Sequence, residues 1–185
     1  MTALYDLIDR TRAANARALI AIDGRCGSGK STLAAQLGEY YSCPVIHMDD
    51  FFLRPEQRTP ERLATPGENI DHERFLAEVL GPLKVSGRCV YRPFRCDTQT
   101  LGTAIEVVVK QLCIIEGSYA CHPSLREAYD VRIFLSVDPD EQLRRITQRN
   151  GEQAAAVFRN KWIPLEEAYF AAHDVAVRCD IQLYT

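Results

Sequence analysis

The stretch that decides the fold is Gly24-Arg25-Cys26-Gly27-Ser28-Gly29-Lys30-Ser31, a loop of the form G-x-x-x-x-G-K-S. The apolar run 18–22 precedes it and predicts a buried strand, and residues 32–37 follow it and predict a helix. A strand, a glycine-rich loop and a helix in this order is the setting in which such a loop binds phosphates. The motif therefore predicts a nucleotide-binding protein, whereas a glycine-rich turn that binds nothing would not require these flanking elements.

The residue types of the loop fit a polyphosphate for physical reasons. Glycines allow backbone N–H groups to approach phosphate oxygens, and the N-terminus of the following helix adds partial positive charge. Lys30 can neutralise the outer phosphates, and the Ser31 hydroxyl can ligate Mg²⁺. We expect the nucleotide to contact the following residues: Gly24, Arg25, Cys26, Gly27, Ser28, Gly29, Lys30, Ser31 and Thr32.

Composition restricts the class of protein. The chain has 185 residues, enough for one domain with a sizeable core, and its hydrophobic content of 46% is ordinary for a globular protein. A net charge of −3 gives no general attraction to nucleic acid or to an anionic membrane, so we expect neither as a partner. The seven cysteines form no C-x-x-C pair, and the first residues do not form a secretory signal, so a reducing cytoplasm is the expected location.

Short apolar runs that alternate with helical patterns predict an α/β fold. The pattern predicts a leading helix near residues 4–14, a helix that begins at the N-cap Asp71 and ends at Gly81-Pro82, and a helix that opens at Asp138-Pro139. Residues 54–69 are expected to form a polar, mobile loop. Further strands are predicted at 44–48, 88–91, 104–109, 111–117, 131–137 and 181–183, with 88–91 and 104–109 forming a pair. The expected architecture is three α/β/α layers around a central parallel sheet of about five strands.

Acidic residues follow two of the predicted strands. Asp49 and Asp50 end the second strand, and Glu116 ends the strand at 111–117. Ligands of open α/β sheets bind at the carboxyl ends of the strands, so these carboxylates are expected near the phosphate loop. A carboxylate there can take the proton of an attacking hydroxyl, and either Asp49 or Asp50 could instead be only a loop cap. No guanine-reading motif of the type N/T-K-x-D is present, which disfavours a GTPase.

In five ordered segments the sequence resembles the uridine kinase-like group of P-loop kinases, relatives of phosphoribulokinase. The resemblance extends over roughly residues 17 to 150, and the ordered set is far more specific than the phosphate loop alone. The segments are Ile22–Ala34, Met48-Asp49-Asp50-Phe51-Phe52, Asn69-Ile70-Asp71-His72, the start of a hairpin at Val90-Tyr91, and Ile115-Glu116-Gly117, and Tyr129–Leu135 follows the same pattern.

The resemblance implies roles for single residues. Asp49 would be the catalytic base, Lys30 would act on the transferring phosphoryl group, and Ser31, Asp49 and Glu116 would serve the metal. Asp71 would hold the sugar hydroxyls of the acceptor, with Tyr91 in the hairpin beside it. It further implies a single P-loop kinase domain over residues 1–185, with a hairpin insertion at about 86–110 and a lid region at about 144–161.

The hairpin departs from the family pattern. The pyrimidine-contacting histidine of the family, five positions beyond Tyr91, falls on Cys96, and a thiol is a weak donor and acceptor. Arg95 and its neighbouring arginines could instead pair with an anionic or carbonyl-rich acceptor. Uridine is therefore expected to be a poor acceptor, unless Arg95 or Gln99 takes the place of the histidine.

The predicted lid carries cations and aromatic side chains. Arg145 and Arg149 are expected to close over the phosphates, although Arg145 could instead pair with Glu141 on its own helix. The aromatic residues of the C-terminal part could stack on a base, but at helical spacing they more often form core: Phe158, Trp162, Tyr169 and Phe170.

The combined prediction is an ATP- and Mg²⁺-dependent kinase. It would transfer the γ-phosphoryl group to a hydroxyl of a small, nucleoside-like or other sugar-containing acceptor. The competing hypothesis is a nucleotide-binding regulatory module or slow ATPase, which needs no acceptor. Asp71 and the hairpin favour the kinase, because an ATPase switch requires neither.

Overall fold

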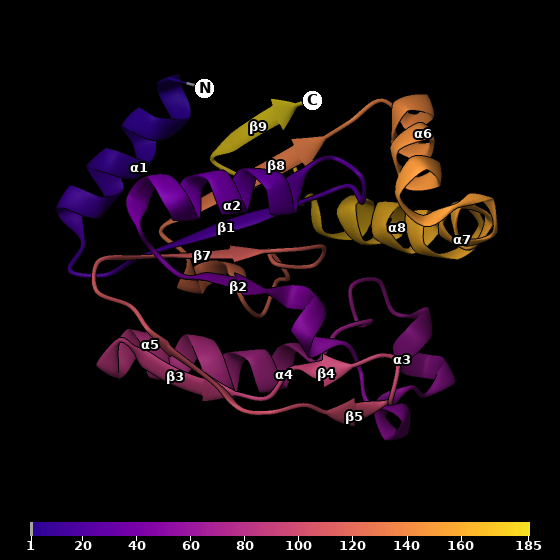
Figure 1. Ribbon diagram of the computed structural model, residues 1–185, viewed down its shortest axis with the longest axis horizontal. Coiled ribbons are helices and arrows are strands. Elements are labelled where there is room, and N and C mark those ends of the chain that lie inside the picture. Colours follow the sequence, from indigo (N-terminus) through magenta and orange to yellow (C-terminus); the bar gives the residue numbers. More distant parts are fainter. Residues whose placement is uncertain (1) are drawn as a thin grey trace.

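The computed structural model describes residues 2–185, so Met1, the first residue of the expected domain, lies outside the described residues. At its centre lies a five-stranded parallel sheet in the order β2-β7-β1-β8-β9 (Figure 1). The strands are β1 (Ala18–Gly24), β2 (Val45–His47), β7 (Leu112–Glu116), β8 (Val131–Ser136) and β9 (Ile181–Tyr184). The prediction of a parallel sheet of about five strands is confirmed.

Alternate residues of β1 bury opposite faces of the sheet. Ile20 and Ile22 pack with Leu4, Ile8 and Leu37 from the helices α1 (Thr2–Ala14) and α2 (Lys30–Tyr41). The intervening β1 residues face a second cluster, to which α4 (His72–Phe75), α5 (Gly81–Ser86) and α8 (Ile163–His173) contribute. Because both faces of β1 are covered, all of its residues are buried and its first five, Ala18–Ile22, are apolar, and the fold has the three α/β/α layers expected.

The helix that begins after Asp71 is longer than the sequence predicts. It consists of α4 (His72–Phe75), a π turn (Leu76–Leu80) and α5 (Gly81–Ser86), and it ends at Gly87, whose φ is 72°. The prediction that Gly81-Pro82 ends it is wrong. The Gly81 N–H bonds to the Leu76 carbonyl, and Pro82 occupies the first turn of α5, where a missing N–H is tolerated.

The segment 54–69, expected as a loop, contains short helices. A 3₁₀ turn (Pro55–Gln57) is followed by α3 (Pro60–Ala64), and the side chain of Thr59 caps α3 by accepting a hydrogen bond from the Arg62 N–H. An N-cap threonine followed by proline is a helix-start signal that the polar composition of the segment concealed.

The predicted strand pair is present and forms part of a lobe whose buried residues share one cluster with the central sheet. β3 (Arg88–Tyr91) pairs antiparallel with β6 (Ile105–Val108), and β4 (Phe94–Arg95) pairs with β5 (Thr100–Leu101). These strands lie with α3, α4 and α5 at the bottom of Figure 1, away from the edge of the sheet that carries β9.

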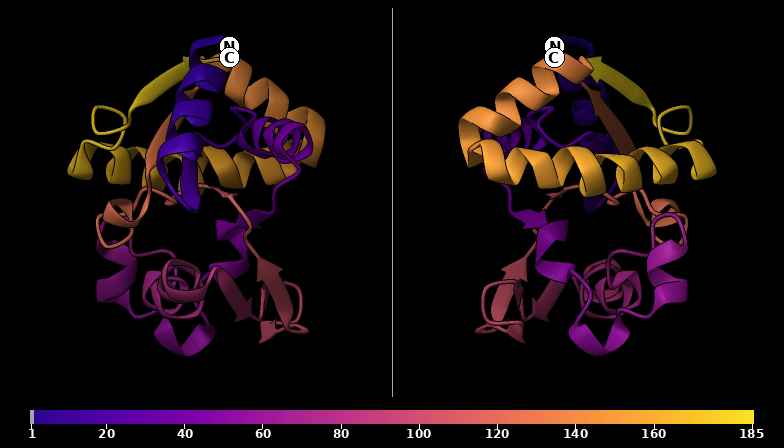
Figure 2. Two further views of the ribbon diagram at one scale, coloured as in Figure 1. Left: turned by 90° about the vertical axis from the view of Figure 1, so that its left-hand side faces the viewer. Right: turned by 90° about the vertical axis from the view of Figure 1, so that its right-hand side faces the viewer.

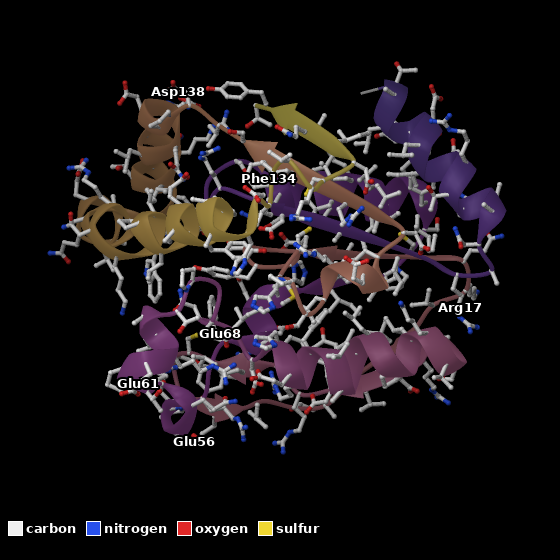
Figure 3. All side chains as sticks on the ribbon, turned by 180° about the vertical axis from the view of Figure 1, so that it is seen from behind. Arg17, Glu56, Glu61, Glu68, Phe134 and Asp138 are labelled. Carbon is white, nitrogen blue, oxygen red and sulfur yellow. The ribbon has the colours of Figure 1, made fainter. Side chains whose placement is uncertain are left out.

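The C-terminal helices lie above this lobe in Figure 1, and His173 Nε2 lies 3.1 Å from the carbonyl oxygen of Pro66, in the segment before α4. They are α6 (Pro139–Asn150), α7 (Glu152–Val157), a π turn (Phe158–Trp162) and α8 (Ile163–His173). The Asp138 side chain, labelled in Figure 3, caps α6 by accepting from the N–H groups of Asp140 and Glu141. In Figure 2, α8 (yellow) runs above the purple-to-pink lobe. Among the helices of residues 2–185, none combines the length and the apolar character that crossing a membrane requires.

Candidate active site

A cavity of about 590 Å³ lies where the phosphate loop meets the carboxyl ends of β1, β2 and β7. This volume is within the range of small-molecule sites. Its wall comes from the loop and the start of α2, the turn after β2, Asn69 before α4, the segment after β7, and the C-terminal helices. The lining residues used below are Cys26, Gly27, Gly29, Lys30, Ser31, Thr32, Asp49, Phe52, Asn69, Glu116, Ser118, Tyr119, Arg145, Arg149, Phe158, Trp162 and Glu166.

Two loop glycines show why side chains are excluded from the loop. Gly29 has a φ of 90°, and a Cβ at this position would meet no atom within 4 Å, so the backbone borders open space. Gly24 has a φ of 134°, and a Cβ there would lie 2.0 Å from the Leu135 carbonyl oxygen. Gly29 leaves room for a ligand, and Gly24, the last residue of β1, can lie against the backbone of Leu135 because it has no side chain.

The predicted nucleotide residues do not all face the cavity. Cys26, Gly27, Gly29, Lys30, Ser31 and Thr32 line it. Arg25 turns away, where its guanidinium bonds to both Glu167 carboxylate oxygens, at 2.6 and 2.9 Å. Ser28 is fully buried. The Lys30 ammonium lies over the loop, donating to the carbonyl oxygens of Gly24 at 2.7 Å and Arg25 at 3.0 Å.

The predicted metal-binding residues converge. The Ser31 hydroxyl lies 3.2 Å from each carboxylate oxygen of Glu116, and Asp49 lines the same cavity. Hydroxyl and carboxylate oxygens are the ligands that Mg²⁺ prefers, so the donor set fits this ion. His47, at the end of β2, donates from Nδ1 to Glu116 at 2.5 Å and holds that carboxylate in place. Hydrogen bonding to Glu116 raises the pKa of His47.

The two aspartates after β2 have different environments. The protein atoms around Asp49, which limit its hydration, and the negative charge of Glu116 raise the pKa of this carboxyl. Asp50 does not line the cavity, and its Oδ2 accepts a hydrogen bond from the Tyr91 hydroxyl at 3.0 Å. Only Asp49 is therefore placed to reach a substrate in the cavity.

The residues expected to hold the acceptor lie outside the cavity wall. Asp71 caps α4, with Oδ1 accepting from the Arg74 N–H, and it is 2% exposed. The Tyr91 hydroxyl is engaged by Asp50, and Arg95 is exposed on the hairpin, as is Cys96. The hairpin residues Arg88, Arg92, Arg95, Cys96 and Gln99 contribute nothing to the wall.

Other residues form the side of the cavity on which we expected the acceptor. Phe52, Asn69 and Tyr119 line it, and the Asn69 side chain donates from Nδ2 to the Tyr119 hydroxyl at 3.1 Å. Asn69 Oδ1 is buried without a hydrogen-bond partner among residues 2–185. Tyr119 adopts a φ of 72°, which is uncommon for a residue other than glycine. Asn69 belongs to the segment Asn69-Ile70-Asp71-His72 that resembles the family. Nothing in the sequence of that segment indicated that Asn69, and not Asp71, lines the cavity.

Both predicted lid arginines line the cavity. Arg145 also donates to Glu141 at 2.7 Å and to the Gly27 carbonyl at 3.2 Å, so the internal pair and the contact with the loop coexist. Arg149 is exposed at the wall, whereas Arg144 pairs with Glu141 away from it. The aromatic residues divide into two groups: Phe158 and Trp162 line the cavity, and Tyr169 and Phe170 are core.

Two buried carboxylates, Asp23 and Glu166, accept hydrogen bonds from backbone N–H groups at the phosphate loop. Asp23 accepts from three backbone N–H groups and the Tyr169 hydroxyl, yet complete burial raises the pKa of its carboxyl to about 6. Glu166 of α8 accepts from the backbone N–H of Cys26 at 2.9 Å. Burial, with the nearby charge of Glu166, raises the pKa of the Cys26 thiol to about 12, so this thiol is not activated and fills space.

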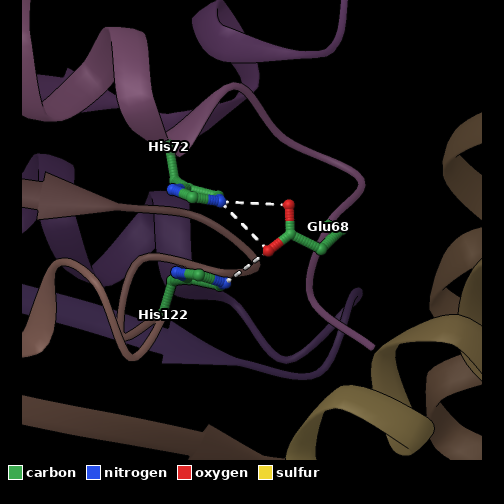
Figure 4. Close-up of side chains that lie close together, drawn as sticks. All are labelled: Glu68, His72 and His122. Carbon is green, nitrogen blue, oxygen red and sulfur yellow. Dashed lines mark hydrogen bonds and ion pairs between the residues drawn. The ribbon is translucent and has the colours of Figure 1, made fainter. Parts of the chain in front are cut away.

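Glu68, His72 and His122 lie close together in one cluster (Figure 4). His72 Nε2 lies 3.0 Å from Glu68 Oε2, and the two imidazole rings stack with centroids 4.2 Å apart. The Ser124 N–H donates to His122 Nδ1, so the ring proton resides on Nε2 and that nitrogen has no lone pair for a metal. The cluster therefore links two segments of the chain. Glu68, which is labelled in Figure 3, lies before α4, and His122 lies after β7.

Three known proteins show what the chain is similar to; no family model matches it. It is 29% identical to the uridine kinase of Clostridium novyi (strain NT) over 153 residues, 75% of this chain and 71% of that protein. It is likewise 29% identical to the uridine kinase of Ligilactobacillus salivarius (strain UCC118) over 150 residues, 75% and 69% of the two chains. A solved structure from Silicibacter sp. TM1040, described as that of a candidate fructose transport system kinase, superposes with a TM-score of 0.76 at 27% identity over 98% of this chain and 97% of that one.

The chain therefore resembles the uridine kinase-like P-loop kinases in sequence and in fold. The resemblance read from five short segments is thereby confirmed, together with the P-loop three-layer fold. Kinases of this kind are phosphotransferases, and the cavity of this chain brings the glycine-rich loop together with carboxylates and with the α6 arginines.

Proposed function

We propose that the protein transfers the γ-phosphoryl group of ATP to a hydroxyl of an uncharged, sugar-containing small molecule. The observation that carries the proposal is the convergence of Lys30, Ser31, Asp49 and Glu116 on one cavity. Phosphoryl transfer needs little covalent chemistry from a protein beyond positioning and charge stabilisation, and these are what this set of groups can supply.

The residues would divide the work as follows. Backbone N–H groups of Gly27 and Gly29 and the start of α2 would bind phosphate oxygens, with Lys30 neutralising their charge. Ser31, Asp49 and Glu116 would hold Mg²⁺, which supplies charge neutralisation on the phosphate oxygens when bound.

Asp49 would accept the proton of the acceptor hydroxyl. Of the two aspartates after β2, Asp49 is the one that lines the cavity, which is the position that a proton acceptor requires. Asp50 is the less suitable candidate, because its carboxylate is held by Tyr91.

Charge distribution supports an uncharged acceptor. The cationic side chains that line the cavity are Lys30 and, from α6, Arg145 and Arg149. The residues on the acceptor side, Phe52, Asn69 and Tyr119, offer an aromatic surface and neutral polar groups. An anionic acceptor would therefore find no paired cation there, whereas sugar hydroxyls could bond to the unpartnered Asn69 Oδ1.

Acceptor-dependent ADP release tests the proposal. The purified protein with Mg²⁺ and ATP is assayed against neutral sugars, anionic sugars, uridine and cytidine. We expect at least one neutral sugar or sugar alcohol to increase ADP release well above the rate without acceptor, and uridine to be poorer than that compound. ADP release that no acceptor increases would favour the slow-ATPase hypothesis, and efficient turnover of uridine or cytidine would show that Cys96 has no bearing on the acceptor.

A further inference from the structure

Helix α8 is fastened to the phosphate loop at three nearby positions. The Tyr169 hydroxyl donates to Asp23 at 2.9 Å, and Glu167 pairs with Arg25. Next to Glu167 in the chain, Glu166 accepts from the N–H of Cys26. The first two contacts involve side chains that lie behind the loop, but the third uses a backbone N–H of the loop itself.

Glu166 is a buried carboxylate with both oxygens engaged. Its Oε2 accepts from the Cys26 N–H at 2.9 Å, its Oε1 accepts from the Ser118 hydroxyl at 2.5 Å, and the residue is 5% exposed. Glu166 also lines the cavity, together with Lys30 and Ser118. A negative charge therefore faces the same space as the groups that would bind polyphosphate.

One peptide unit connects this carboxylate to Lys30. The peptide between Arg25 and Cys26 accepts from the Lys30 ammonium through its carbonyl oxygen, at 3.0 Å, and donates to Glu166 through its N–H. Both charges influence the pKa of the Cys26 thiol, Glu166 raising it and Lys30 lowering it. The lysine of such a loop reaches the outer phosphates, so Glu166 lies at the end of the cavity where the terminal phosphate would bind.

We propose that Glu166 is a specificity-determining residue that weakens the binding of a nucleoside triphosphate relative to the diphosphate. This inference rests on the proposed use of ATP. The carboxylate occupies a loop N–H that phosphate oxygens could otherwise take, and it repels the terminal phosphate, which ADP lacks. The lysine and the lid arginines oppose this repulsion, and the balance between them sets the affinity for ATP.

Glu166→Gln separates the charge from the hydrogen bonds. The glutamine amide oxygen can still accept from the Cys26 N–H, and its NH₂ can donate to the Ser118 hydroxyl oxygen, so both contacts survive without the charge. Glu167→Gln is the matched control, because it removes the same charge from the neighbouring residue of α8, which pairs with Arg25 and does not line the cavity.

The test is direct binding with Mg²⁺ present, using ADP and a non-hydrolysable ATP analogue. Trp162, the only tryptophan of the chain, lines the cavity and provides an intrinsic fluorescence signal, with calorimetry as an independent readout. We expect Glu166→Gln to tighten binding of the analogue about tenfold, equivalent to ~1.4 kcal/mol, and to change ADP binding less than about twofold. Glu167→Gln is expected to leave the ratio of the two affinities close to that of the wild type.

The outcomes separate the two hypotheses. An unchanged ratio in Glu166→Gln, or weaker binding of the analogue, would overturn the role proposed for Glu166 and indicate that the residue only supports the loop. A wild-type protein that binds neither nucleotide would instead overturn the proposed function. Thermal melting of each variant verifies that the fold is retained.

Discussion

The phosphate end and the acceptor end of the cavity are built in different ways. The phosphate end is a run of consecutive residues, 24–31, placed between β1 and α2. The acceptor end brings together Phe52, Asn69 and Tyr119, which are separated by long stretches of chain. A contiguous site can be recognised from local sequence, because its geometry follows from one strand, one loop and one helix. A dispersed site depends on how whole segments pack.

The largest effect is expected at Asp49, which lies where the phosphate end of the cavity meets the acceptor end. Asp49→Asn keeps the shape of the side chain and removes the proton acceptor, so we expect the rate of the chemical step to fall on the order of 10²–10⁴-fold. Asp50→Asn is the matched control and should lose much less, because Asp50 supports Tyr91 and does not line the cavity. Pre-steady-state phosphoryl transfer measures both, and a larger loss in Asp50→Asn would reassign the base.

The phosphate end is tested by Lys30→Ala. We expect turnover to fall about 10²–10³-fold, because the variant removes the cation of the loop that would stabilise charge on the transferring group. Lys84→Ala, on α5 and outside this cavity, serves as the control and should retain its activity. Wild-type turnover in a folded Lys30→Ala protein would remove the basis for a phosphate site at this loop.

The acceptor end is tested by Asn69→Ala. Loss of one neutral hydrogen bond is expected to raise the KM for the acceptor about fivefold to tenfold, with the KM for ATP nearly unchanged. Asn15→Ala makes the same substitution at the end of α1, outside this cavity, and should change neither constant. Equal increases in both KM values for Asn69→Ala would mean that the two ends of the cavity are not separate sites.

The smallest effect concerns the contact that holds the acceptor-side segment. Burial, with His72 and His173 nearby, lowers the pKa of His122 to about 3, against 6.5 for an ordinary histidine. Between these pH values the unfolded chain binds more protons than the folded protein, so His122 makes stability decrease as the pH falls below 6.5. The slope from this group is at most about 1.4 kcal/mol per pH unit.

Urea unfolding at pH 7 and pH 5 measures this effect. His122→Asn should lose less stability between the two pH values than the wild type. The comparison cancels the contribution of Asp23, which has the opposite sign because its pKa in the folded protein is raised to about 6. An equal loss in both proteins would show that His122 takes up a proton without penalty in the folded state.

Local sequence predicted most of the fold and one half of the candidate site. The strand runs, the Asp71 cap and the start of a helix at Asp138-Pro139 were predicted correctly, since they depend on neighbouring residues. The prediction that the helix ends at Gly81-Pro82 was wrong. A π turn continues the helix past these residues, because the Gly81 N–H bonds to the carbonyl of Leu76, five residues earlier. Asp71 and Asn69 lie two residues apart, and only packing decides which of the two faces the cavity.

The sequence by itself determined a glycine-rich loop between a strand and a helix, a parallel sheet, and carboxylates at the carboxyl ends of its strands. These features follow from the residue types and from spacings of a few positions, which fix local backbone geometry. Only the tertiary structure decided that Arg95 and Tyr91 stay outside the cavity and that Glu166 of α8 contacts Cys26, 140 positions earlier. Such contacts form when elements that are distant in the chain pack together, and short-range sequence patterns do not indicate which elements will pack.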